Sequence, residues 1–125
     1  MQPQLGYIDM GTTGTWYQAR DACLNAGHQM PILQSSAENA ALATFLNANT
    51  LPRTWLALSD TYTEGVLEWT VSTVHRFVLG SAYTNFDPGA ATNTGSLDCV
   101  DFPAGTAVWR MRGCNQMKSI VCMQV

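Results

Sequence analysis

Apolar residues near the start of the chain recur at the spacing of an amphipathic helix. Trp16, Ala19 and Cys23 stand three or four positions apart, so a helix would bring them onto one face. Thr15 to Gln18 forms a capping box, in which each side chain bonds the free backbone amide of the other residue. Gly27 is suited to end the helix in a left-handed conformation. The pattern predicts a helix that begins at Thr15 and points Cys23 inward.

A second stretch repeats this pattern. Ser35 to Glu38 carries the same capping-box signature and opens a predicted helix of about three turns. Leu42, Phe45 and Leu46 form its predicted buried face, and Pro52 ends any continuation. Both predicted helices therefore lie in the first half of the chain.

Outside the helices the apolar period becomes that of strands. A short strand is predicted at 6–10, followed by a turn-rich break at 11–14, and residues 55–58 are the strongest candidate for a buried strand. Residues 59–95 are rich in turn-forming residues and predict a long, mostly irregular segment that is anchored by aromatic side chains. Three closely spaced strands follow at 98–123. This order predicts an α+β fold with a mainly antiparallel sheet.

The composition limits the size and the partners of this fold. The chain has 125 residues, an ordinary size for one domain, so we treat 1–125 as a single domain. Charged residues make up only 12%, against a usual share of roughly 25%, so polar uncharged residues must cover the surface. The net charge of −3 argues against nucleic acid or an anionic membrane as the partner. The apolar runs are also too short for membrane insertion.

Four cysteines are the clearest chemical feature of the chain. They are Cys23, Cys99, Cys114 and Cys122. No two of them form a Cys-x-x-Cys pair, and only His28 and His75 would add further soft ligands, so a zinc site is disfavoured. A disulfide framework is favoured, which indicates an oxidising, extracellular setting and a secreted protein. The spacing alone leaves all three possible pairings open.

A series of motifs runs in a fixed order along almost the whole chain. They are the helix face of Trp16, Ala19 and Cys23, then Trp55-Leu56-Ala57-Leu58, Glu64-Gly65, Glu68-Trp69, Tyr83 through Gly89, Asp98-Cys99-Val100, Trp109 five residues before Cys114, and Val121-Cys122-Met123. Each motif is weak alone, but their order and spacing together are specific. In this combination they resemble the C-type lectin-like domains.

The resemblance implies both a fold and a disulfide pairing. The implied fold is α+β, with two helices packed on small antiparallel sheets and a long irregular loop region. The implied pairing is Cys23 with Cys122 and Cys99 with Cys114. The sequence has no additional N-terminal cysteine pair, so it resembles the short form of the family, which has two disulfides.

Sugar-binding members of this family hold calcium in the long loop, and calcium requires six to eight oxygen ligands. This chain departs from the ligand set, because Leu97 replaces a glutamate and Arg110 and Met111 stand where an Asn-Asp pair is expected. We therefore expect neither calcium nor another cofactor at the sugar-binding site. A remnant of an auxiliary calcium site stays as a weaker hypothesis, and calcium there stays open. The residues that match that auxiliary site are Asp60, Glu64 and Asp98.

Arg110 and Arg112 form a second candidate site. They alternate on a predicted strand and so share one face, and the resemblance places that face at the ligand surface. Guanidinium groups suit carboxylate, sulfate or phosphate, because they donate forked hydrogen bonds. The alternative is that both are solvated side chains that aid solubility.

The sequence favours a recognition module over an enzyme. No serine or free cysteine stands in a nucleophile motif. We expect a secreted module that binds a protein or a glycan through its long loop and late strands without calcium. The candidate ligand contacts are Asp87, Asn93, Arg110 and Arg112. Two alternatives stay open: a calcium-dependent lectin with unusual ligands such as Asp87, Asn93 and Asp98, and a surface-structural protein that binds ice or mineral through its threonines. The sequence leaves the oligomeric state open.

Overall fold

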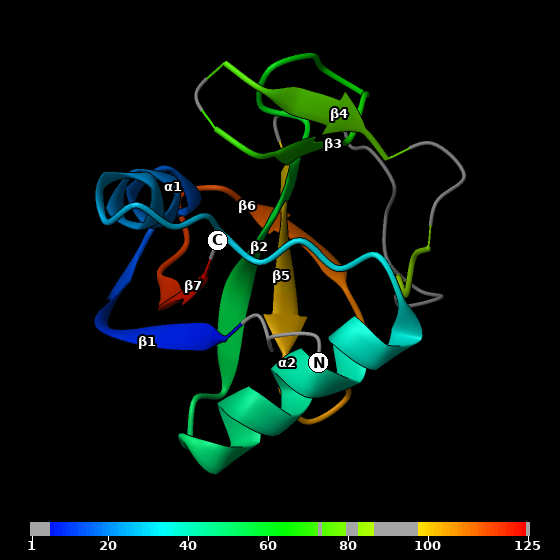
Figure 1. Ribbon diagram of the computed structural model, residues 1–125. Helices are drawn as coiled ribbons and strands as arrows, with labels where there is room; N and C mark the ends of the chain where they lie inside the picture. The colour runs from blue at the N-terminus through cyan, green and yellow to red at the C-terminus, as the bar shows by residue number, and fades with distance from the viewer. Residues whose placement is uncertain (1–5, 73, 80–82, 87–97, 125) are drawn as a thin grey trace, which may run out of the picture.

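The computed structural model describes residues 6–72, 74–79, 83–86 and 98–124, which form an α+β fold (Figure 1). In chain order the elements are β1 (Tyr7–Gly14), α1 (Trp16–Asn25), α2 (Ser36–Ala48), β2 (Arg53–Ser59), β3 (Glu68–Thr70), β4 (Arg76–Val78), β5 (Asp98–Pro103), β6 (Arg110–Gly113) and β7 (Lys118–Met123). No helix within these ranges has the length and apolar composition needed to cross a bilayer. The fold class is therefore the one that the sequence predicts.

The strands join one sheet that branches at β2. Along one path the order is β1-β7-β2-β3-β4, and β5 also pairs with β2 and carries β6 on its other side. Most neighbours are antiparallel, but β2 and β7 are parallel where Thr54 lies beside Ser119. Figure 1 shows α1 next to β1 and β7, and α2 across the lower end of β2 and β5. The sheet thus places β7 and β5 beside β2, and β6 beyond β5.

The first helix begins and ends where the sequence predicts. The Thr15 hydroxyl accepts a hydrogen bond from the Gln18 amide at 3.2 Å, and the Gln18 side chain accepts from the Thr15 amide at 2.9 Å. Gly27 follows the C-terminal cap with a φ of +82°, a conformation that costs glycine little. Trp16, Ala19 and Cys23 are buried. The capping box and the apolar spacing were therefore sufficient to place α1.

The second helix differs from its prediction in two details. Ser35 caps the helix by accepting from the Glu38 amide at 3.2 Å, but the Glu38 side chain accepts from the Gln34 amide instead of returning to Ser35. Its buried residues are Asn39, Leu42 and Leu46, whereas Phe45 is only half-buried and lies 5.8 Å from the Tyr7 ring. Asn39 therefore occupies a position on the buried face that the apolar pattern did not include.

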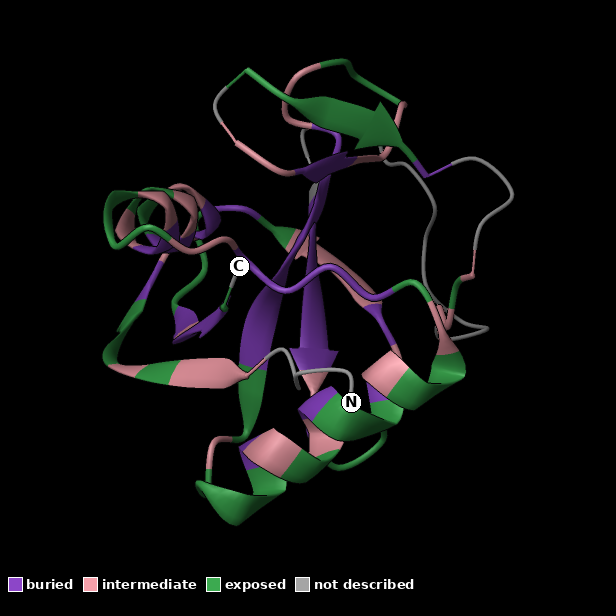
Figure 2. Ribbon diagram, viewed as in Figure 1, coloured by how far each residue is buried: buried purple, intermediate pink, exposed green. Residues whose placement is uncertain are grey.

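The core lies around β2 and β5, which are the most continuously buried strands (Figure 2). All four tryptophans belong to this core, as the sequence predicted. They are Trp16, Trp55, Trp69 and Trp109. Two of them direct the indole nitrogen to backbone carbonyls: Trp16 donates to Leu56 at 2.9 Å and Trp55 donates to Gly14 at 3.0 Å. These bonds satisfy the polar atom that a buried tryptophan brings with it.

Two parts of the sheet differ from the sequence prediction. β1 continues through 11–14, where a turn-rich break was expected, and its register against β7 shifts between Asp9 and Thr13. Gly11 allows this bulge because its φ is +74°, and its amide donates to the Asp9 carboxylate at 2.8 Å. β4 was not predicted at all, since its three residues are all exposed and show no buried face.

Candidate functional site

Two disulfide bonds tie the late strands to the rest of the fold. Cys23 on α1 is bonded to Cys122 on β7, and Cys99 on β5 is bonded to Cys114 directly after β6. These are the two pairs that the resemblance implied. The described residues include no free cysteine. The bridges fit an oxidising, extracellular compartment.

Trp109 is the centre of an aromatic cluster at the base of the long loop region. Its ring meets those of Trp69, Tyr83 and Phe86 edge to face, with centroids 5.6, 5.9 and 5.2 Å away. Edge-to-face contacts of this kind stabilise beyond the area that they bury. Residues 83–86 of the loop region are thereby anchored against β3 and against the residue that precedes β6.

Two asparagines fix the polar side of the same anchor. The Trp109 indole nitrogen donates to Asn39 Oδ1 at 2.8 Å, and the Asn39 amide donates to the Ala107 carbonyl at 3.0 Å. Asn85 donates to the same carbonyl at 2.7 Å, and the Asn85 carbonyl accepts from the Trp109 amide at 2.8 Å. Buried polar groups are costly when unpaired, so these bonds set the orientation of Trp109 and the starting point of β6. Sequence reasoning missed Asn39, although it stands three positions before Leu42 on the predicted helix face.

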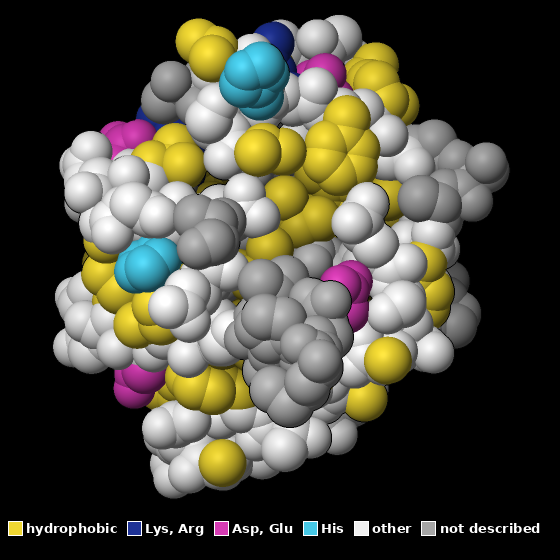
Figure 3. Space-filling model, in the orientation of Figure 1, with side chains coloured by type: hydrophobic (Ala, Val, Ile, Leu, Met, Phe, Trp, Pro, Cys, Tyr) yellow, Lys and Arg dark blue, Asp and Glu magenta, His cyan; other side chains and the backbone are white. Residues whose placement is uncertain are grey.

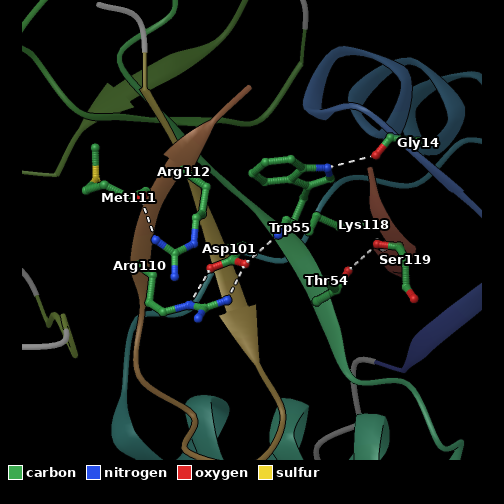
Figure 4. A network of polar contacts seen from close by, with 9 residues as sticks. All are labelled: Gly14, Thr54, Trp55, Asp101, Arg110, Met111, Arg112, Lys118 and Ser119. Carbon is green, nitrogen blue, oxygen red and sulfur yellow. Dashed lines mark hydrogen bonds and ion pairs between the residues drawn. The ribbon is translucent and has the colours of Figure 1, made fainter. Parts of the chain in front are cut away.

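Asp101 forms a buried ion-pair network between β5, β6 and β7 (Figure 4). Its side chain is fully buried and accepts two hydrogen bonds from Arg110, from Nε at 3.1 Å and from Nη2 at 2.9 Å. Lys118 Nζ lies 3.3 Å from the same carboxylate, and the Lys118 side chain is only 7% exposed. Two cations thus share one carboxylate, so the network carries an excess of positive charge.

Arg112 projects from the same face of β6 as Arg110, as the alternation along the strand predicts (Figure 4). The register places Arg110 opposite Asp101 and Arg112 opposite Cys99, so the residue directly across from Arg112 carries no carboxylate. Within the described part of the chain, the Arg112 side chain makes one hydrogen bond, to the Met111 carbonyl at 3.5 Å, which is at the limit for such a bond. Arg110 therefore stabilises the sheet, whereas no other residue that the structure describes accepts a hydrogen bond from the Arg112 side chain.

Burial lowers the pKa of Lys118 below the ordinary range of a lysine. The positive charges of Arg53 and Arg110 act in the same direction, and the Asp101 carboxylate opposes them. Lys118 also lies over the Trp55 ring, with its ammonium 5.9 Å from the ring centroid. The pKa of Lys118 falls because desolvation and the two neighbouring arginines together have a larger effect than the one carboxylate that Lys118 shares with Arg110.

The residues that match an auxiliary calcium site lie directly after β2 and at the start of β5, where Ser59 pairs with Cys99. Asp60 is buried and its Oδ2 accepts a hydrogen bond from the Gly65 amide at 3.2 Å, while Glu64 is exposed. Asp98 is the first residue of β5 and pairs with Gly113. Across the described ranges, no group of three or more His, Cys, Asp or Glu side chains is arranged to hold a metal ion. The candidate ligand contacts Asp87 and Asn93 lie outside the described residues.

The surface around these residues is poor in charge. Figure 3 shows a face with few charged side chains, on which apolar side chains gather most densely near β3 and β4. Val74 and Val78 are 77% and 57% exposed there, and Phe77 is 38% exposed. The Asp101 network therefore brings together charged residues in a chain that has few of them.

The chain was compared with known families and structures. It matches the family described as the Lectin C-type domain over residues 12–124. It is 31% identical over 114 residues to the pulmonary surfactant-associated protein D of Bos taurus, and this match covers 90% of the chain. A C-type lectin from the tunicate Polyandrocarpa misakiensis superposes with a TM-score of 0.79 at 14% identity, covering 98% of both chains. A calcium-independent type II antifreeze protein superposes with a TM-score of 0.78 at 19% identity, covering 100% of this chain and 89% of the other.

These similarities differ in what they establish. The two solved structures share the fold at identities that carry no further information about the site. The chain spans only 28% of the length of the bovine relative, so the activity of that whole protein does not transfer to it. The family match extends over residues 12–124 and includes both disulfides. The chain therefore belongs to the C-type lectin domain family.

Proposed function

We propose that this chain is an extracellular recognition module that binds a glycan or a protein through its long loop region and β5 to β7, without calcium. The observation that carries this proposal is the side chain directly after Trp109. There Arg110 forms two hydrogen bonds with the buried Asp101 carboxylate. In calcium-binding members the corresponding position supplies an oxygen ligand.

Calcium binding at this position would be energetically unfavourable. A guanidinium repels a divalent cation, and Met111 offers a thioether where calcium prefers a charged oxygen. Arg110 cannot be displaced without leaving Asp101 buried next to Lys118 alone. Breaking a buried pair in this way is strongly unfavourable. The arrangement therefore supports binding that uses protein side chains directly.

The class of ligand is supported by the family and by the fold. C-type lectin domains are generally non-enzymatic, and members of the family present a loop surface above a rigid, disulfide-bonded sheet. Here the aromatic cluster of Trp109 fixes part of that loop region to the sheet. A binding surface on such a support loses little conformational entropy when its ligand arrives.

The test is the dependence of binding on calcium. The oxidised protein should be screened against arrays of glycans and extracellular proteins in the presence of calcium and again with a chelator, with a calcium-requiring C-type lectin as the matched control. We expect the chain to bind the same ligands in both conditions, while the control loses its binding. A saturable calcium titration by calorimetry, followed by sugar binding only in the calcium form, would instead establish a calcium-dependent lectin.

A surface-structural function is the second candidate. The similarity in fold to a calcium-independent type II antifreeze protein favours it, together with the exposed Thr12 and Thr13 on β1. Ice-recrystallisation inhibition measures this activity directly. We expect none for the recognition module. Inhibition that disappears when Thr12 and Thr13 are replaced by lysine would assign the chain to the second candidate.

A further inference from the structure

We propose that the face of β6 around Arg112 is a subsite for an acidic sugar, which it binds through a sulfate or carboxylate group. This inference rests on the proposed function and names one class of ligand for it. Arg112 makes the direct contact with the anion. Arg110 and Lys118 act as positioning residues, because both are committed to Asp101 and supply positive charge from beneath the subsite.

The distribution of charge carries the first step. The chain contains six Lys and Arg residues in total, and its net charge is −3. Four of the six belong to this region. Arg110 and Lys118 bond Asp101, Arg112 shares the strand face of Arg110, and Arg53 precedes Thr54, which lies beside Ser119 on β7. The ion pairs described in this region use a single carboxylate. A bound anion would therefore compensate an excess of positive charge that the fold has gathered at one place.

The Arg112 guanidinium has hydrogen-bond donors that no described residue uses. Arg110 uses Nε and Nη2 for Asp101, and the one described hydrogen bond of the Arg112 side chain is the long contact to the Met111 carbonyl. Side chains two positions apart on a strand stand roughly 7 Å from each other on one face. An oxyanion with charge-assisted hydrogen bonds of about 2.8 Å on each side spans about that distance. One sulfate or carboxylate can thus accept a forked pair of hydrogen bonds from Arg112, while Arg110, committed to Asp101, adds positive charge nearby.

The surroundings favour a sugar over an acidic peptide or a nucleic acid. The turn after β6 carries the exposed amides of Asn115 and Gln116, which suit hydroxyl groups. The sequence has only two other Lys or Arg residues, Arg20 and Arg76; each contacts a carboxylate, and both contact Tyr62. A nucleic acid would need a row of cations along many successive phosphates, and four basic residues gathered in one place do not form such a row. A single oxyanion among hydroxyls matches what the face offers.

The test uses the oxidised chain and defined saccharides. A heparin-derived hexasaccharide provides sulfates and carboxylates, its desulfated form provides carboxylates alone, and maltohexaose provides neither. Affinities are measured by calorimetry for the wild type, Arg112→Gln, Arg112→Lys and Arg20→Gln. Arg20→Gln is the matched control, because it removes the same charge from a pair between Arg20 and Asp21 on α1. The unfolding midpoint of each variant confirms that it is folded.

We expect the wild type to bind the heparin hexasaccharide, with an affinity that falls as salt rises. Arg112→Gln should weaken this binding by roughly tenfold or more, since it removes a charged hydrogen-bond donor. Arg112→Lys should lose less, because it keeps the charge and loses the fork, and Arg20→Gln should bind as the wild type does. The desulfated form identifies which of the two anionic groups is recognised.

Three results would overturn the inference. The first is a wild type that binds neither acidic saccharide. The second is an equal loss in Arg112→Gln and Arg20→Gln, which would mean a general effect of charge. The third is binding of polyaspartate as tight as that of the hexasaccharide, which would assign the face to an acidic protein. In each case, chelator-resistant binding to neutral glycans or proteins would still support the proposed function.

Discussion

Replacing the buried carboxylate of Asp101 tests how the late strands are stabilised. Asp101→Asn keeps the size and shape of the side chain but removes the charge that Arg110 and Lys118 share. Removing one partner from a buried ion pair costs about 3 to 5 kcal/mol, because the remaining charge stays buried without compensation. Lys118 is 7% exposed and Arg110 is 21% exposed, so water still reaches part of the Arg110 charge. We therefore expect a loss near the lower end of that range, about 3 kcal/mol.

The chain offers a matched control for this change. Arg20 Nε lies 3.0 Å from Asp21 Oδ1, so the geometry of the pair is similar, but the Asp21 side chain is 55% exposed. Exposed pairs of this kind contribute about 0 to 1 kcal/mol, because water and salt screen them. Asp21→Asn should therefore reduce the free energy of unfolding by less than about 1 kcal/mol.

The measurement is urea unfolding with the disulfides intact, followed by tryptophan fluorescence. Two-state analysis gives the free energy of unfolding of the wild type, Asp101→Asn and Asp21→Asn under the same conditions. We expect Asp101→Asn to lose at least about three times as much free energy of unfolding as Asp21→Asn. Equal and small losses for both variants would show that burial of the Asp101 network does not stabilise the fold.

Two further predictions concern the disulfides and Tyr7. The Cys23–Cys122 bridge joins residues 99 positions apart and the Cys99–Cys114 bridge joins residues 15 apart, so loop entropy predicts losses of about 4.7 and about 3 kcal/mol when each pair is replaced by alanines. Urea unfolding of the two double variants should show the larger loss for Cys23→Ala with Cys122→Ala, and the reverse order would contradict the loop-entropy account. Burial, assisted by the Glu38 charge, raises the pKa of Tyr7 from 10.0 to about 12, so the stability that neutral Tyr7 contributes is present below about pH 10 and is lost as pH rises towards about 12. The thermal midpoint of the wild type should fall more steeply over this window than that of Tyr7→Phe, and parallel curves would contradict the pKa change.

The sequence predicted the elements whose determinants are local. The capping box of Thr15 and the glycine at Gly27 depend on residues within one helix, so they placed α1 correctly. Residues 55–58 of β2 form a short apolar run that follows Pro52, and this length and this flanking proline favour a buried strand over a helix. The disulfide pairing, in contrast, came only from the resemblance to a family, because cysteine spacing leaves all pairings open.

The parts that the sequence could not predict depend on pairing between distant segments. β4 becomes a strand because Phe77 pairs with Trp69, and its own residues carry no alternating pattern. Asp101 and Arg110 meet because of the register between β5 and β6, which neither segment specifies alone. Arg110 was expected at the ligand surface from its position alone, and its bond to the buried Asp101 carboxylate was not foreseen; its contact with a ligand stays a prediction. Arg112, the alternating residue, makes a single long hydrogen bond within the described ranges, to the Met111 carbonyl.

The Cys23–Cys122 bridge also determines how the domain responds to mechanical force. β1 and β7 are antiparallel, with Tyr7 beside Met123, so tension applied between the two ends of the described chain separates their hydrogen bonds one rung at a time. The separation reaches Cys122 at the next rung, where Ile8 is its partner. From there the load passes through the disulfide to Cys23, and only β1 and α1 remain in the path of the force. The part of the chain between the two cysteines, which are 99 positions apart, is mechanically bypassed, so β2 to β6 stay folded while β1 and the start of α1 yield.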